Sequence, residues 1–161
     1  PLHTGHQGRI DQVVVYDRAL TDSEIRAMYS FASFVTDTTN ISVANGGTQK
    51  FTLNVGPAFR GKRYWIHGSV TGILPGIVLA GIPILLMPDP YTDLLIAVGN
   101  SAVLTNFRGT LSAVGVATAS LNIPAGLSIP VGYKLFHAYL IYDGTTGKIL
   151  GSSNPAWLQF K

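Results

Sequence analysis

Few side chains in this sequence have the types and spacing that catalysis requires. Four histidines and eight acidic residues occur among 161 residues, and cysteine is absent. Covalent catalysis needs a nucleophile, a base and an orienting group that converge on one point, and no motif here brings such a set together. The lack of cysteine also excludes disulfides and thiolate metal ligands. We therefore predict a protein that is not an enzyme, with no catalytic, cofactor or metal residues.

The histidines fall into two groups. His3 and His6 form "HTGH" near the beginning of the sequence, a weak metal motif for which an unstructured chain end is the simpler interpretation. His67 shares a predicted strand face with Trp65, and His137 lies in an alternating apolar segment. We interpret these two as buried or half-buried structural histidines.

The acidic residues outside the first 35 positions lie mainly in turns. Asp89, Asp93 and Asp143 lie in or beside predicted turns, where aspartate commonly accepts hydrogen bonds from its own backbone. A calcium site that uses Asp89 and Asp93 is the alternative, although their spacing matches no known calcium loop. A glycosidase would need two carboxylates that face each other across a cleft, which this pattern does not predict.

Two sets of residues are candidates for binding. Arg60, Lys62 and Arg63 form a basic cluster at a predicted hairpin tip, where they would contact an anionic glycan or carboxylates of a neighbouring subunit. Trp65 and Trp157 would stack on sugar rings if they were exposed on one face. These five residues are the possible glycan or interface contacts, with core packing as the alternative for the tryptophans.

The composition narrows the class of protein. Apolar residues make up 47% and charged residues 12% of the chain, and the net charge is +3. Nucleic-acid binding needs clustered cations, so we predict no nucleic-acid partner. A polar surface with few charges is typical of secreted β-proteins and of subunits that pack against copies of themselves. The most apolar segment, 72–87, is too short to span a membrane and contains prolines, so we interpret it as buried strands with a turn.

Short alternating segments dominate the sequence after residue 36. "FTLNV" places Phe51, Leu53 and Val55 on one face, as in a half-buried antiparallel strand. Turn signals such as "NGG", "FRGK" and "DGTTG" separate such segments. The other predicted strands are 64–70, 77–87, 93–98, 116–123, 134–142 and 148–160. The fold class is therefore all-β, an antiparallel β-sandwich of jelly-roll or immunoglobulin-like type.

The first 35 residues have a different pattern. In "GRIDQVVVYDRALTDSEIRAMY", residues 8–17 alternate as a strand, and Thr21 with Glu24 forms a capping box for a helix at about 22–29. This is the one helix that the sequence predicts. The domain organisation is therefore a strand and helix extension at 1–35, followed by the β-sandwich at 36–161.

Two resemblances rest on these segments. Residues 8–29 resemble the final strand and helix of a laminin-G-like or concanavalin A-like jelly roll, of which they cover about the last fifth. In 40–161, stretches such as "ISVANGGTQKFTLNVGPAFRGKRYWIHGSV" and "MPDPYTDLLI" resemble an uncharacterised C-terminal β-sandwich module of large secreted proteins from planctomycetes and related bacteria. The resemblance implies an extracellular or cell-surface location and no particular activity.

A single strand with an apolar face is not stable alone, because its backbone groups need partners. Its partner would be the edge of its own sandwich, an upstream domain or another copy of the chain. We predict a non-catalytic extracellular structural subunit, a homo-oligomer that assembles into a filament or surface layer by β-strand addition. The alternative is a carbohydrate-binding, adhesion or anchoring module with glycan partners. The predicted assembly strand consists of Ile10, Gln12, Val13, Val14, Val15 and Tyr16.

Overall fold

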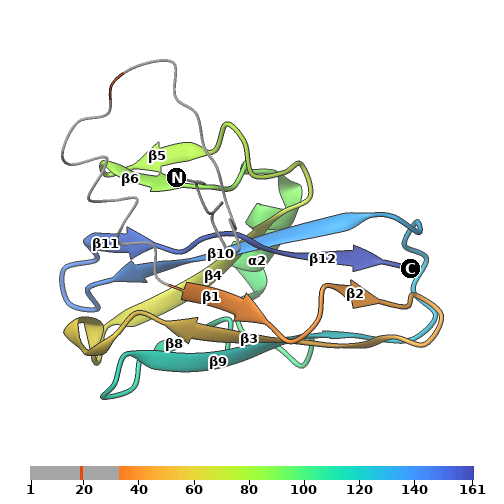
Figure 1. Ribbon diagram of the computed structural model, residues 1–161, viewed down its shortest axis with the longest axis horizontal. Coiled ribbons are helices and arrows are strands. Elements are labelled where there is room, and N and C mark those ends of the chain that lie inside the picture. The colour runs from red at the N-terminus through yellow and green to blue at the C-terminus, as the bar shows by residue number, and fades with distance from the viewer. Residues whose placement is uncertain (1–18, 20–32) are drawn as a thin grey trace, which may run out of the picture.

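Two β-sheets form the body of the protein in a computed structural model that describes residues 19 and 33–161 (Figure 1). The first sheet contains β1 (Ser33–Thr36), β3 (Gly47–Asn54), β9 (Val116–Ile123) and β7 (Leu104–Thr105), in that spatial order. The second contains β2 (Asn40–Ile41), β12 (Ala156–Phe160), β10 (Lys134–Tyr142), β4 (Arg63–Ser69) and β8 (Arg108–Thr110), with β11 (Ile149–Ser152) also paired to β10. Pairing is antiparallel except between β12 and β2. The predicted all-β sandwich is confirmed.

The core lies between the two sheets, and alternation along the strands produces it. In β3, Gln49, Phe51 and Leu53 are buried while their neighbours are exposed. Phe51 stacks on Phe34 of β1 at 5.0 Å between ring centroids, and Phe34 meets Tyr139 of β10 edge-on at 5.1 Å. These rings connect the first sheet to the second through a closely packed aromatic cluster.

Several predicted strands are confirmed. The segments 116–123 and 134–142 coincide with β9 and β10, and the segment 64–70 differs from β4 by one residue at each end. The predicted strand 148–160 is interrupted between β11 and β12. Pro155 lacks a backbone donor, and the Asn154 side chain binds both the N–H and the C=O of Phe34, so this stretch leaves the ladder.

The predicted strand at 93–98 is wrong, because these residues belong to helix α2 (Pro90–Val98). Asp89 is the N-cap and accepts from the backbone N–H groups of Tyr91 and Thr92, while the Thr92 side chain accepts from the Asp89 N–H. Pro90 occupies the first turn, where its missing donor has no cost. A capping box therefore decides the conformation of an apolar run that resembled a strand.

The segment 77–87 is a hairpin rather than one buried strand. Strands β5 (Ile77–Leu79) and β6 (Ile82–Ile84) are joined by Ala80 and Gly81, which both have positive φ. The β6 side packs on the outer face of the second sheet, where Ile84 and Leu86 join Ala138 and Leu140 in a separate buried cluster (Figure 1). The β5 side is exposed, so the prediction of burial holds only for the second half of this segment.

A short 3-10 helix, η1 (Pro57–Phe59), precedes β4. Strand β1 begins at Ser33, so the first sheet includes three residues ahead of the predicted boundary at 36. The predicted strand 8–17, its assembly residues and the predicted helix 22–29 lie outside the described residues. Within 19 and 33–161, no helix is long and apolar enough to cross a membrane.

Candidate functional site

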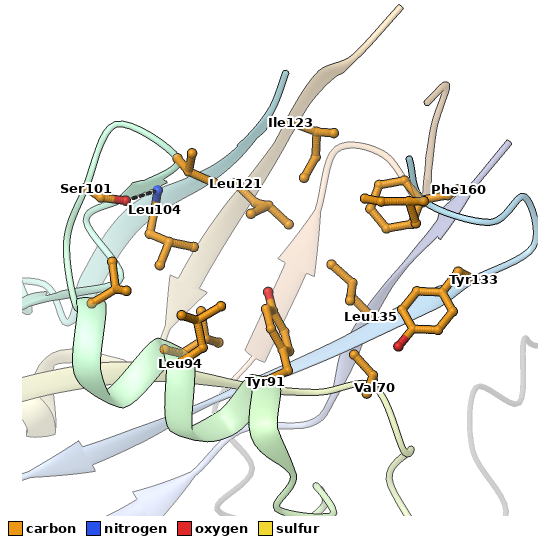
Figure 2. A pocket seen from close by; sticks show the side chains of 14 residues that line it. Val70, Tyr91, Leu94, Ser101, Leu104, Leu121, Ile123, Tyr133, Leu135 and Phe160 are labelled. Carbon is orange, nitrogen blue, oxygen red and sulfur yellow. Dashed lines mark hydrogen bonds between the residues drawn. The ribbon is translucent and has the colours of Figure 1, made fainter. Parts of the chain in front are cut away.

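An apolar pocket of about 460 Å³ lies between the two sheets beside α2 (Figure 2). One wall is a stripe along the helix that consists of Tyr91, Leu94, Leu95 and Val98. These positions follow the spacing i, i+3, i+4, i+7 and therefore share one helix face. The sequence does not predict this wall, because residues 93–98 fit a strand, in which these four side chains would not share a face.

The other walls come from both sheets and the loops between them. Leu104, Leu121 and Ile123 face the helix from the first sheet, and Leu135 and Phe160 close the far end from the second (Figure 2). The remaining lining residues are Val70, Ser101, Val103, Ile129 and Tyr133. Five separate stretches of chain thus build the pocket, and no local sequence motif marks it.

The mouth of the pocket is recognised by the exposure of its lining residues. Leu94 is 53%, Val98 46%, Tyr133 41% and Val103 40% exposed, whereas Leu95 on the inner side is 1% exposed. Exposed apolar side chains that surround an apolar hollow are a feature of binding sites rather than of ordinary surface.

Polar groups in the pocket are few and uncharged. The Ser101 Oγ accepts a hydrogen bond from the Leu104 N–H at 3.0 Å. The Tyr91 hydroxyl lies 2.9 Å from Nε2 of His137. Burial, with a smaller contribution from the nearby Asp89 charge, holds the pKa of Tyr91 well above its usual value, so the hydroxyl is neutral. No Asp, Glu, Lys, Arg or His lines the pocket as described.

His137 is a structural residue of the core, as predicted. It is 0% exposed and lies edge-on to Phe51 and Phe107, with ring centroids 5.3 and 5.9 Å away. Burial lowers its pKa to about 3, so the ring is neutral at ordinary pH. Its Nδ1 has no hydrogen-bond partner in the part of the chain that the structure describes.

Asp89 joins the end of β4 to the start of α2 through hydrogen bonds to its carboxylate. Its carboxylate accepts five hydrogen bonds of 3.2 Å or less, from Ser69 Oγ and from the backbone N–H groups of Val70, Thr71, Tyr91 and Thr92. Burial raises the pKa of Asp89, but the donors outweigh that effect and lower the pKa to about 2. The interpretation of Asp89 as a residue that binds nearby backbone is confirmed.

The calcium alternative has no structural support in the described ranges. Both Asp89 oxygens are already engaged, and Asp93 is exposed one turn into α2. Within residues 19 and 33–161, no group of three or more His, Asp or Glu side chains is placed to hold a metal ion.

The basic cluster lies in the connection between β3 and β4, which belong to different sheets, so the predicted hairpin tip is wrong. Lys62 forms an ion pair of 2.5 Å with Asp143, and this hydrogen bond is the main reason that the pKa of Asp143 lies below its usual range. Arg60 follows η1 and Arg63 begins β4. Whether Arg60, Lys62 and Arg63 contact a glycan or a subunit stays a prediction.

The two tryptophans do not form one platform. Trp65 lies opposite Leu140 and Trp157 opposite Phe136 across β10, about 13 Å apart along the strand direction. The Arg108 guanidinium covers the Trp65 ring at 3.6 Å. Trp157 is 39% exposed, with the Lys134 ammonium 5.4 Å from its ring.

His67 lies beside the Trp65 ring, with 4.7 Å between ring centroids. Burial, and secondarily the charge of Arg108, lowers the pKa of His67 to about 4. The residue is half-buried, as the sequence predicts, and its ring is neutral at ordinary pH. This corner of the second sheet is therefore a packed arrangement of Trp65, His67 and Arg108, and glycan contact by Trp65 or Trp157 stays a prediction.

The exposed side of the hairpin is a second candidate surface. Val78 is 71%, Leu74 69%, Leu79 44% and Ile77 37% exposed. Residues 64–88 contain no Asp, Glu, Lys or Arg. We call the four exposed residues the aliphatic hairpin surface. Sequence analysis missed it because an uncharged aliphatic run suggests burial.

No family model matches this sequence, and no curated protein matches it either. The resemblances of 8–29 and 40–161 to secreted bacterial domains therefore stay predictions. Function has to be argued from the pocket and from the aliphatic hairpin surface.

Proposed function

We propose that this protein is a non-catalytic extracellular structural subunit that assembles by β-strand addition. The hairpin β5–β6 is the acceptor, and segment 8–17 of a neighbouring copy is the donor. The observation that carries the proposal is the exposed and uncharged edge of β5 at Val78, which pairs with no strand among residues 33–161.

The hairpin geometry presents backbone groups at this edge. In a two-residue turn, Leu79 and Ile82 exchange hydrogen bonds, so the next pair, Val78 and Pro83, directs its backbone groups outward. On the β6 side the Pro83 carbonyl accepts from Ser152 Oγ at 2.6 Å. On the β5 side no strand among the described residues pairs with Val78. Its N–H and C=O are therefore available to an added strand.

The edge also lacks the protection that soluble proteins usually provide. Charged side chains and prolines normally block edge strands from pairing with other chains. Here β5 contains neither, whereas β1 has the backbone of Phe34 occupied by Asn154, and β7 has only two residues. Of these three edges, β5 is the one best suited to accept a partner.

The donor segment supports the same conclusion from the sequence. Residues 10–16 alternate, with Ile10, Val14 and Tyr16 on one face, and such a strand needs a ladder partner and an apolar contact. The aliphatic hairpin surface offers both. A strand donated head-to-tail makes a heterologous contact, which yields a ring or a filament on repetition.

Light scattering coupled to size exclusion, with electron microscopy, tests the proposal on the full chain. We expect concentration-dependent assemblies that Val78→Lys and deletion of residues 1–20 both reduce to monomers. Val131→Lys is the matched control, because Val131 is a valine with 73% exposure against 71% for Val78. A monodisperse monomer at every concentration, or equal effects of the two lysine variants, would refute the assembly.

A glycan-binding module is the second candidate, and exposed Trp157 beside Lys134 favours it. An indole face with a neighbouring cation suits an acidic sugar. We expect a glycan array to show binding that Trp157→Ala removes. An array without any binding contradicts this role.

A further inference from the structure

We propose that the pocket beside α2 binds one unbranched alkyl chain of an amphiphile, whose polar head stays at the mouth. The inference is independent of the proposed assembly, because the pocket and the aliphatic hairpin surface share no residue.

The lining determines the chemical class of the ligand. Its side chains are aliphatic or aromatic, and the polar ones are Ser101, Tyr91 and Tyr133. The Ser101 Oγ already accepts from the Leu104 N–H, and the Tyr91 hydroxyl is paired with His137. A sugar, nucleotide or peptide would lose hydrogen bonds to water on entering and find few replacements. An alkyl chain loses none.

The shape of the pocket selects a long, thin ligand. Its helical wall runs from Tyr91 to Val98, eight residues whose seven helical rises span about 10 Å. Figure 2 shows Tyr91 and Leu94 along this wall, with Leu104, Leu121 and Ile123 opposite and Tyr133 and Phe160 toward one end. A slot between a helix and a sheet fits an extended chain better than a compact ring system.

The size and the apolar lining of the pocket favour occupation. Its volume of about 460 Å³ lies within the range of small-molecule sites. Water in such an apolar space lacks the two to four polar partners that ordered water needs, and apolar cavities of this kind take up hydrocarbon instead.

The rim explains how the ligand enters and where its head remains. Leu94, Val98 and Val103 are exposed at the mouth, and Tyr133 is 41% exposed. An alkyl chain would cover part of this apolar surface as it binds. No charged side chain of the residues that the structure describes lines the pocket, so we expect little discrimination between charged and neutral heads.

The direct test is a fluorescence titration of the full chain with cis-parinaric acid, whose emission rises in an apolar environment. We expect saturable one-to-one binding. Dodecanol and dodecanoate should both displace the probe, with affinities within about tenfold of each other. Failure of the wild-type chain to bind either compound saturably would overturn the proposal.

A pair of helix variants locates the site. Val98→Trp fills the pocket from its rim, whereas Ile96→Trp lies on the same helix with 43% exposure, against 46% for Val98, and does not line the pocket. We expect Val98→Trp to weaken binding by about tenfold or more and Ile96→Trp to leave it unchanged within about twofold. Equal losses would refute the assignment. Circular dichroism verifies folding, and Leu94→Lys, which places a charge at the mouth, replaces Val98→Trp if that variant is unfolded.

Phosphatidylcholine vesicles distinguish the sources of the chain. Transfer of a fluorescent lipid from vesicles to the protein, abolished by Val98→Trp, assigns the ligand to a membrane lipid. Binding of dodecanol without lipid transfer assigns it to a free amphiphile, and both results support the site. Adsorption to vesicles without saturable alkyl binding would instead indicate a surface interaction and overturn it.

Discussion

Asp89→Asn tests the network that fixes the beginning of α2. The asparagine has one acceptor oxygen in place of two, and its amide donors must then face backbone donors. Asp89 Oδ1 accepts hydrogen bonds from the N–H groups at the start of the helix, whereas Oδ2 accepts from Ser69, Val70 and Thr71. Either orientation of the amide therefore leaves one set of donors without a partner.

The size of the effect follows from the hydrogen bonds. Partly buried donors without partners cost about 1–3 kcal/mol, so we expect Asp89→Asn to lower the free energy of unfolding by about 2 kcal/mol near pH 6. Separately, the pKa of Asp89 falls from 3.8 to about 2. At about 1.4 kcal/mol per pKa unit, this pKa shift corresponds to about 2.5 kcal/mol of stability for the folded state. Because the carboxylate is partly exposed, solvent screening reduces its contribution to about 1 kcal/mol.

The sign of the pH dependence is determined by the direction of this shift. A carboxylate with a depressed pKa in the folded state stabilises the fold fully above the unfolded value and loses that contribution as pH falls through the folded value. For Asp89 the loss occurs between about pH 4 and about pH 2. The difference in unfolding free energy between wild type and Asp89→Asn should therefore shrink by about 1 kcal/mol across that interval.

Urea unfolding followed by tryptophan fluorescence, at a series of pH values, measures this difference. Asp93→Asn is the control: it removes an exposed carboxylate from the same helical turn and should change the unfolding free energy by less than about 0.5 kcal/mol. A difference between wild type and Asp89→Asn that is constant from about pH 6 to about pH 2 would refute the role of the ionised carboxylate.

Two further substitutions test the packing of α2 and the turn of the hairpin. A Cβ at Gly68 would lie 2.4 Å from Cε1 of Tyr91 and 2.8 Å from Cδ1 of Leu95, so Gly68→Ala should destabilise by about 1–3 kcal/mol in urea unfolding. Gly151→Ala, whose nearest contact is 3.8 Å away, should have a smaller effect, and equal losses would contradict the packing argument. Ala80 has φ 52° in the two-residue turn, where asparagine is favoured, so Ala80→Asn should raise the thermal midpoint, with a gain of about 0.5 kcal/mol. Ala80→Val should lower it, and a lower midpoint for Ala80→Asn would show that the turn has another conformation.

The long central strands could be predicted because the pattern that defines them, alternation of buried and exposed side chains, lies within each strand. In β9 and β10 the alternation of side chains is enough to define strand and bounds. Helix α2 was missed because "DLLIAV" is short and apolar, which fits a strand as well as a helix. The decisive signal was upstream, in Asp89, Pro90 and Thr92, where a cap and a first-turn proline precede the run.

The candidate site could not be predicted for a different reason. The pocket combines residues as distant in sequence as Val70 and Phe160, which only the packing of the sheets brings together. The hairpin surface was missed because burial depends on whether a partner element lies over a strand. Ile84 has the outer face of β10 beneath it, whereas Val78, six positions earlier, has no partner strand on its outer edge within the described part of the chain.

The position of α2 explains why the pocket is preformed. The first sheet ends at β7, which has only two residues, so at this side of the sandwich a helix rather than a strand covers the gap. Asp89 and the close approach at Gly68 hold the N-terminal end of that helix against β4. At the other end, the Arg108 guanidinium donates to the carbonyl of Ile96 while it stacks on Trp65.

Because both ends of α2 are held, its pocket-facing stripe is fixed before any ligand arrives. Binding then requires little ordering of the chain, which is the main entropic penalty in association. Loosening one end should therefore weaken alkyl binding without any change in the lining. Arg108→Gln, which removes the charge and the stacked guanidinium but no residue that lines the pocket, should lower the affinity for cis-parinaric acid by between about twofold and about tenfold in a folded protein. An unchanged affinity in that variant would mean that the pocket keeps its shape without the clamp at the C-terminal end of the helix.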